Sequence, residues 1–82
     1  MASKLEKGLK MTFAKTLTKI RKDKEMSVSE LATLSGLTEM TIYNYEKGLY
    51  LPSYTSVGKL ATALKCDYDL LYEALATDIK SK

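Results

Sequence analysis

The chain is short, moderately apolar and weakly basic, with 82 residues, 45% of them hydrophobic, and a formal net charge of +3. This is the composition of one ordinary globular domain. The absence of histidine and the single cysteine, Cys66, argue against a zinc site, a histidine-dependent hydrolase and an internal disulfide. We therefore expect a protein that is not an enzyme, with no metal and no cofactor, in a reducing cytoplasm.

Positive charge is concentrated at the start of the sequence. Residues 1–24 hold eight of the basic residues and only two acidic ones. This asymmetry indicates either a basic end that faces a polyanion or a well-solvated terminus. Residues 1–10 lack the apolar stretch of a signal peptide, and no apolar run is long enough to span a bilayer, so we expect no membrane partner.

Apolar residues at spacings of three and four predict five helices, at about 11–24, 28–34, 39–47, 55–65 and 68–76. No segment shows the alternation of a strand, so the fold class is all-α. The segment 1–10 is expected to be an N-terminal arm or a frayed helix start. The domain then spans 11–76, and 77–82 form a frayed C-terminal tail.

Capping signals divide the middle of the chain into two short helices. Ser27 and Glu30 have the spacing of a capping box, Gly36 ends the first helix, and Thr38 caps the next. Two short helices joined by a tight turn containing glycine form the helix-turn-helix arrangement. The small Ala32 allows the second of these helices to cross close over the first.

Residues from Phe13 to Leu71 combine into a pattern that resembles the Cro/CI (Xre-like) helix-turn-helix family of phage repressors and bacterial regulators. The pattern comprises Phe13, Leu17, Ile20-Arg21, Ser27, Glu30-Leu31-Ala32, Gly36-Leu37-Thr38, Thr41-Ile42, Tyr45-Glu46-Lys47-Gly48, Pro52-Ser53, Leu60-Ala61-Thr62-Ala63-Leu64 and Asp69-Leu70-Leu71. The resemblance implies a five-helix, lambda-repressor-like DNA-binding domain whose third helix reads bases.

The resemblance also implies roles for single residues. It places the base-contacting side chains at Glu39, Met40, Thr41, Tyr43 and Asn44, and the phosphate contacts at Ser27, Val28, Thr38, Lys47 and Lys22. Val28 stands where many members have glutamine, which leaves only backbone N–H groups to bind phosphate there. Arg21 and Glu46 are implied to form an ion pair that ties the first helix to the end of the third.

The residues of the third helix support this interpretation independently. If Ile42 and Tyr45 face the core, then Glu39, Met40, Tyr43 and Asn44 face outward. Asparagine can bond to adenine, glutamate can accept from cytosine, and methionine can pack on a thymine methyl. Other interpretations stay open: Glu39 can serve the helix dipole, Met40 can fill the core or a dimer contact, Tyr43 can shield the helix, and Asn44 can be a plain surface residue.

We expect a transcriptional regulator, most simply a repressor, that acts as a homodimer on double-stranded DNA with a pseudo-palindromic operator and without a small-molecule ligand. The expected dimer contact is on the fifth helix, at Tyr68, Leu71, Tyr72 and Leu75. The alternative is a protein-interaction module, such as an antitoxin or coactivator adaptor, that would use Tyr50, Tyr54, Tyr68 and Tyr72. Cys66 is expected to be a buried, inert thiol.

Overall fold

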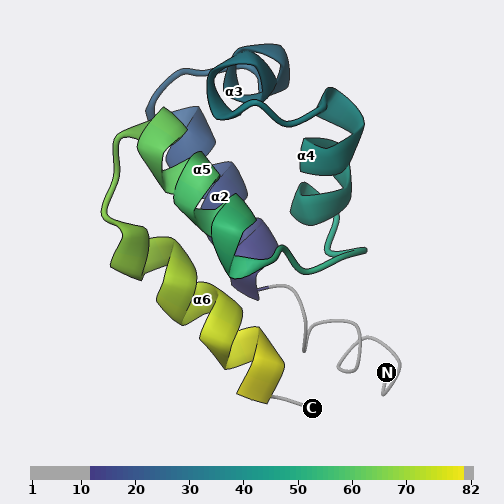
Figure 1. Ribbon diagram of the computed structural model, residues 1–82, viewed down its shortest axis with the longest axis vertical. Coiled ribbons are helices and arrows are strands. Elements are labelled where there is room, and N and C mark those ends of the chain that lie inside the picture. The colour runs from purple at the N-terminus through teal and green to yellow at the C-terminus, as the bar shows by residue number, and fades with distance from the viewer. Residues whose placement is uncertain (1–11, 81–82) are drawn as a thin grey trace.

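The computed structural model describes residues 12–80, which fold into helices without a strand (Figure 1). The helices are α2 (Thr12–Asp23), α3 (Val28–Ser35), α4 (Glu39–Glu46), α5 (Tyr54–Leu64) and α6 (Tyr68–Lys80). The fold is all-α, with the five helices in the predicted order. The expected arm at 1–10 lies outside the described residues. None of the described helices is both long and apolar enough to cross a membrane.

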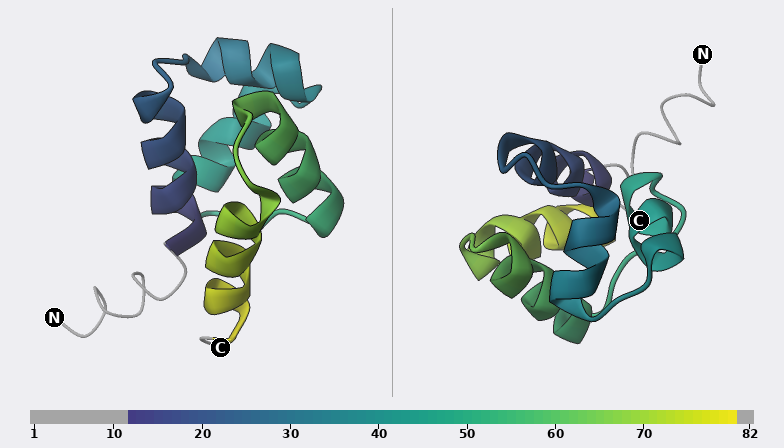
Figure 2. Two further views of the ribbon diagram at one scale, coloured as in Figure 1. Left: turned by 90° about the vertical axis from the view of Figure 1, so that its left-hand side faces the viewer. Right: turned by 90° about the horizontal axis from the view of Figure 1, so that it is seen from above.

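Every helix contributes to one core. The helix α2 packs against α4 and α6, α3 packs against α4 and α5, and α5 packs against α6 (Figures 1 and 2). The core side chains that are completely inaccessible to solvent come from all five helices and are Phe13, Leu17, Leu31, Ile42, Val57, Leu60 and Leu71. The rings of Phe13 and Tyr45 meet edge to face, with centroids 6.3 Å apart, which joins α2 to α4.

The two ends of α3 follow their sequence signals. The Ser27 Oγ accepts a hydrogen bond from the Glu30 N–H at 3.0 Å, and the Glu30 carboxylate accepts one from the Ser27 N–H at 2.9 Å, so the predicted capping box is confirmed. At the other end, Gly36 has a φ of 77°, and its N–H donates to the Ala32 carbonyl. Glycine adopts this left-handed conformation at low cost, which explains why the helix ends there.

The last helix corrects one expectation. It continues through residues 77–80, which were predicted to be a frayed tail, whereas residues 81–82 lie outside the described part. The reason is Asp78, whose side chain is completely buried and accepts hydrogen bonds from the N–H groups of Thr12 at 3.1 Å and Phe13 at 2.9 Å. These N–H groups open α2 and have no partner within their own helix, so Asp78 caps α2 from the far end of the chain.

Cys66 lies in the short connection between α5 and α6. Its side chain packs against the core but is half-buried rather than buried. Burial raises the pKa of the thiol, which keeps it protonated and weakly nucleophilic.

Candidate nucleic-acid interface

The helices α3 and α4 are joined by the three residues 36–38 and form a helix-turn-helix. Ala32 is almost fully buried, and Leu37 packs against the core at the turn. The inner side of α4 consists of Ile42, which is fully buried, and Tyr45, which is nearly so. The opposite side of α4 faces away from the other helices, at the edge of the molecule (Figures 1 and 2). The whole outer face of this helix is therefore available to a partner.

The orientation of α4 is held by an ion pair with α2. The Arg21 Nε lies 2.6 Å from one carboxylate oxygen of Glu46, and its Nη2 lies 3.0 Å from the other. The two side chains are only 12% and 11% exposed. The remaining nitrogen, Nη1, donates to the Met26 carbonyl at 2.8 Å. One guanidinium thus joins α2, the α2–α3 connection and the end of α4, and its bond to Glu46 raises the pKa of Arg21.

The proposed base-contacting residues fall into two groups. Glu39, Met40 and Tyr43 are exposed, Met40 at 67% and Tyr43 at 44%. Thr41 and Asn44 are half-buried, and the Thr41 hydroxyl accepts a hydrogen bond from the Thr38 hydroxyl at 2.8 Å. Thr41 is therefore engaged in the cap of its own helix, whereas Met40 and Asn44, four residues apart, share one outward face.

The proposed phosphate-contacting residues lie at helix ends. Ser27 and Thr38 are exposed N-caps of α3 and α4, and each side chain accepts a backbone N–H three residues on. Lys47 is the exposed C-cap of α4, and Lys22 is exposed in the last turn of α2. Val28 differs, because its side chain packs against the core, and only its backbone can face a phosphate.

The model of the HTH_3 helix-turn-helix family matches residues 17–71, which is more than half of the chain. The chain belongs to the HTH_3 family. The predicted resemblance to Cro/CI-type regulators is confirmed, and the matched segment runs from α2 to the first turn of α6.

Several known proteins are similar to this HTH_3 chain. It is 35% identical over 65 residues to the HTH-type transcriptional repressor RghR of Bacillus subtilis (strain 168), a match that covers 77% of the chain and 48% of RghR. The chain thus spans about half the length of that repressor. The restriction-modification controller protein C.AhdI of Aeromonas hydrophila is 34% identical, with a TM-score of 0.72 over 74% of this chain and 92% of C.AhdI.

A third similarity concerns the fold alone. An HTH_3 family transcriptional regulator from Vibrio cholerae gives a TM-score of 0.74 at 22% identity, over 82% of this chain and 38% of that protein. The five-helix arrangement is therefore that of HTH_3 regulators.

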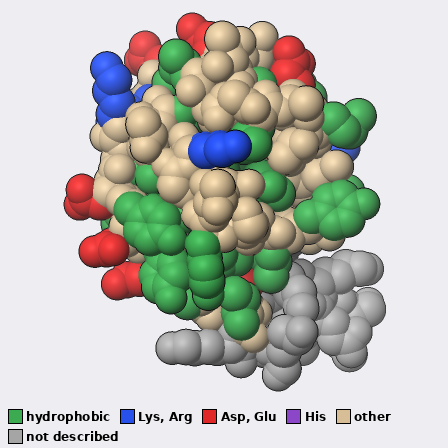
Figure 3. Space-filling view, in the orientation of Figure 1, with side chains coloured by type: hydrophobic (Ala, Val, Ile, Leu, Met, Phe, Trp, Pro, Cys, Tyr) green, Lys and Arg blue, Asp and Glu red, His purple; other side chains and the backbone are tan. Residues whose placement is uncertain are grey.

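A second feature of this HTH_3 domain is a cluster of three tyrosines, Tyr54, Tyr68 and Tyr72, which we call the tyrosine cluster. The rings of Tyr68 and Tyr72 stack with centroids 5.6 Å apart, and Tyr54 lies 5.3 Å from Tyr72. A hydrogen bond with Tyr72 raises the pKa of Tyr54. In the same region, Figure 3 shows hydrophobic side chains gathered over α6 beside several acidic ones.

Two of the four residues of the predicted dimer contact lie in the core. Leu71 and Leu75, which were expected to take part, are 0% and 1% exposed because they form the inner stripe of α6 against the core. Tyr68 remains 38% exposed and Tyr72 half-buried. Ile79, 41% exposed and seven residues after Tyr72, continues the same side of the helix.

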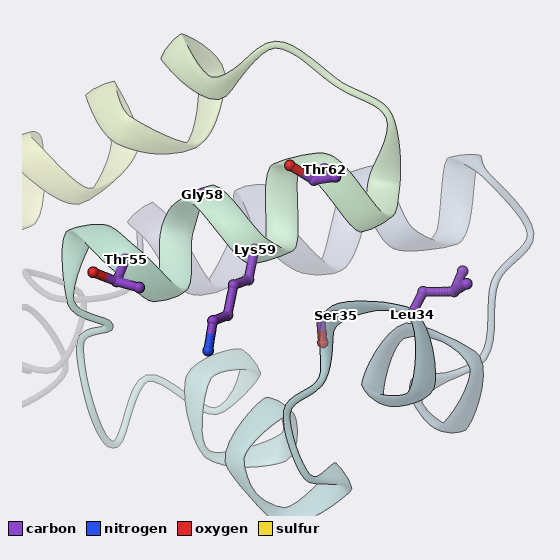
Figure 4. Close-up of a pocket in the computed structure, with 6 residues that line it drawn as sticks. All are labelled: Leu34, Ser35, Thr55, Gly58, Lys59 and Thr62. Carbon is purple, nitrogen blue, oxygen red and sulfur yellow. The ribbon is translucent and has the colours of Figure 1, made fainter.

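A hollow of about 450 Å³ lies between the end of α3 and α5 (Figure 4). It is lined by Leu34, Ser35, Thr55, Gly58, Lys59 and Thr62. The Ser35 hydroxyl is already used in the turn, where it donates to the Ala32 carbonyl and accepts from the Leu37 N–H. Residues 12–80 contain no group of three or more histidine, cysteine, aspartate or glutamate side chains that could hold a metal ion.

Two contacts of α2, the helix that holds α4, were not found from the sequence. The Met26 carbonyl as the third partner of Arg21 has no signature, because any residue could supply it. Asp78 does have one, since it lies seven residues after Leu71 and three after Leu75, on the buried stripe of α6. An acidic residue at such a position indicates a buried partner for its carboxylate.

Proposed function

We propose that this chain is a sequence-specific transcriptional repressor that acts in the cytoplasm. It binds double-stranded DNA by inserting α4 into the major groove. The observation that carries the proposal is the outward face of α4, where Met40 is exposed and Asn44 is half-buried. The Arg21–Glu46 ion pair holds the C-terminal end of this helix against α2. The major groove accommodates one α-helix, and helix-turn-helix domains insert their second helix there. Family membership and the similarity to a repressor support the same function.

In this arrangement, Glu39, Met40, Tyr43 and Asn44 reach base edges, with Thr41 beside them at the edge of the reading face. Phosphates are bound at the flanks, by the Lys22 and Lys47 ammonium groups and at the N-termini of α3 and α4, which Ser27 and Thr38 cap. The capping box takes up the N–H groups of Ser27 and Glu30, so a phosphate at α3 would be bound by the next N–H group, that of Val28.

Selection of bound sequences from random duplex DNA tests this proposal and yields the operator. Asn44→Ala is then expected to weaken operator binding by roughly 1–3 kcal/mol and random-DNA binding much less, because a base contact carries sequence information. Lys47→Ala serves as the matched control and should weaken both about equally. An unchanged ratio of specific to non-specific affinity in Asn44→Ala, at one fixed salt concentration, would show that the reading face is wrongly assigned.

We also propose that the chain binds DNA as a homodimer, joined through the tyrosine cluster and Ile79. These residues expose apolar area along α6 and at the start of α5. A two-fold pair of α4 helices requires a pseudo-palindromic operator with half-sites about 34 Å apart. Tyr68→Ser should weaken the dimer. The same substitution at Tyr50, which is 63% exposed and lies outside the cluster, should not. Light scattering that finds one chain per operator complex would contradict the dimer.

The second candidate function is a protein-interaction module, such as an antitoxin or coactivator adaptor. It is favoured by the exposure of Tyr50 and Tyr54, at 63% and 54%, which offers a protein partner aromatic surface outside α4 itself. Binding to a random duplex at low salt separates the two candidates. A chain that does not bind DNA under those conditions supports the interaction module.

A further inference from the structure

The outward face of α4 has an unusual chemistry for a helix that reads DNA, because it lacks a cation in its first two turns. Its side chains are the carboxylate of Glu39, the thioether of Met40, the phenol of Tyr43 and the amide of Asn44. The nearest cation on α4 is Lys47, at the C-cap. The face is therefore neutral or negative where it would meet the base edges.

This composition restricts which bases α4 can recognise. The most frequent specific contact in the major groove is a bidentate bond from arginine, or a bond from lysine, to O6 and N7 of guanine. Arg21 is the single arginine of the whole sequence, and all three of its nitrogens are engaged, two with Glu46 and one with the Met26 carbonyl. Its side chain is 12% exposed and faces the interior of the domain. A guanidinium is thus not available to read guanine beside α4.

Two of the groups that are present, the Asn44 amide and the Met40 thioether, match A·T pairs instead. The Asn44 amide offers a donor and an acceptor in the arrangement that adenine presents at N7 and N6. Met40 lies one turn earlier on the same face, and its 67% exposure leaves the flexible thioether chain free to pack on a neighbouring base. The apolar group that the major groove offers is the C5 methyl of thymine.

We propose that Asn44 and Met40 read A·T pairs, and that Met40 determines one position of each half-site by packing on the C5 methyl group of thymine. The inference rests on the proposed function, since it concerns the same face of the same helix. It adds the class of base pair that Asn44 and Met40 accept and the atom of the base that Met40 contacts.

Replacing thymine by uracil in the selected operator tests the methyl contact directly, because uracil keeps every pairing and groove hydrogen-bonding group and lacks only the methyl. One thymine position per half-site should lose about three- to fivefold in affinity when it is replaced, as expected for the burial of one methyl group. In Met40→Ala, the same replacement should have no effect, so the two changes are not additive.

Leu34→Ala is the matched control, because Leu34 is 61% exposed and lies on α3, outside the reading face. This variant should keep the full sensitivity to uracil. Operators without a uracil-sensitive thymine, or a sensitivity that survives in Met40→Ala, would overturn the inference and leave the proposed function standing. A chain that selects no sequence at all would overturn both.

Discussion

At the scale of single residues, the orientation of α4 depends on the bonds made by one side chain. Arg21 bonds to both carboxylate oxygens of Glu46 and to the Met26 carbonyl, in a site that is nearly closed to solvent. A charge in such a site is stabilised by its partner and is costly when that partner is removed. The pair therefore contributes more to holding α4 in place than an exposed ion pair would, such as that of Lys19 with Asp23.

Glu46→Ala is expected to lower the free energy of unfolding by roughly 3 kcal/mol, because it leaves Arg21 buried without a counter-charge. Thermal unfolding followed by circular dichroism measures the effect. Lys47→Ala, the next residue along, is exposed and should change the melting temperature little. Equal and small effects of the two substitutions would show that the pair does not stabilise the fold.

Asp78→Ala is expected to lower the free energy of unfolding by about 2 kcal/mol, because it removes an N-cap and leaves the N–H of Phe13 buried without an acceptor. Glu73→Ala on the exposed side of the same helix is the control and should have a small effect. Urea unfolding compares the two variants. If they unfold at the same urea concentration, then the contact between the ends of the chain contributes no stability.

The contacts of some of these residues could be predicted from the sequence and those of others could not, for a physical reason. The Arg21–Glu46 pair was predicted because both side chains belong to a pattern shared by a family. The partners of Asp78 are backbone N–H groups, which every residue but proline carries, so the sequence does not mark them. A carboxylate on an apolar stripe indicates that a partner exists without indicating where it lies.

At the scale of helices, local signals determine where most elements begin and end. Ser27, Thr38 and Ser53 each cap a helix through the side chain, and Gly36 ends α3 with a positive φ. The predicted starts and ends of the first four helices agree with the structure to within one residue wherever it describes them. The end of α6 could not be predicted in this way, because the tertiary contact of Asp78, and not a local stop signal, accompanies its extension to Lys80.

Substitutions of two glycines test these helix signals, because they should change the free energy of unfolding in opposite directions. Gly36→Ala should destabilise the fold by about 1 kcal/mol, because a φ of 77° is unfavourable for alanine although nothing lies within 4 Å of its Cβ. Gly58→Ala, inside α5, should stabilise it by about 0.5–1 kcal/mol, since the new Cβ makes only an ordinary contact, 3.9 Å from a Tyr68 ring carbon. Melting temperatures that shift in the same direction would contradict this account.

At the scale of the whole molecule, charge and shape act together. Residues 12–80 carry nine basic and nine acidic side chains, so the surplus of positive charge belongs to the ends of the sequence. Within the described part, α6 exposes the carboxylates of Asp69 and Glu73, whereas Lys22 and Lys47 lie at the ends of α2 and α4. This separation favours an approach to DNA with α4 first and α6 away from the phosphates.

The affinity for DNA should therefore fall steeply with salt. Each lysine that neutralises a phosphate adds close to one unit to the slope of log affinity against log salt concentration. Lys22→Ala and Lys47→Ala are each expected to lower the slope by about one. Lys65→Ala, at the C-cap of α5, should leave it unchanged. A slope that is equal in all three variants and in the parent chain would contradict the proposed placement of the phosphates.

The burial of Asp78 also has a consequence for how the protein is made. Its two hydrogen bonds join residues that are 65 and 66 positions apart, so the beginning of the chain must wait for residue 78 to be synthesised. A growing chain on the ribosome can form the helix-turn-helix early, but its first helix keeps open N–H groups until the last helix emerges. The domain is thus completed only when α6 is present, and a chain that stops short of residue 78 leaves the N–H groups of Thr12 and Phe13 without this cap.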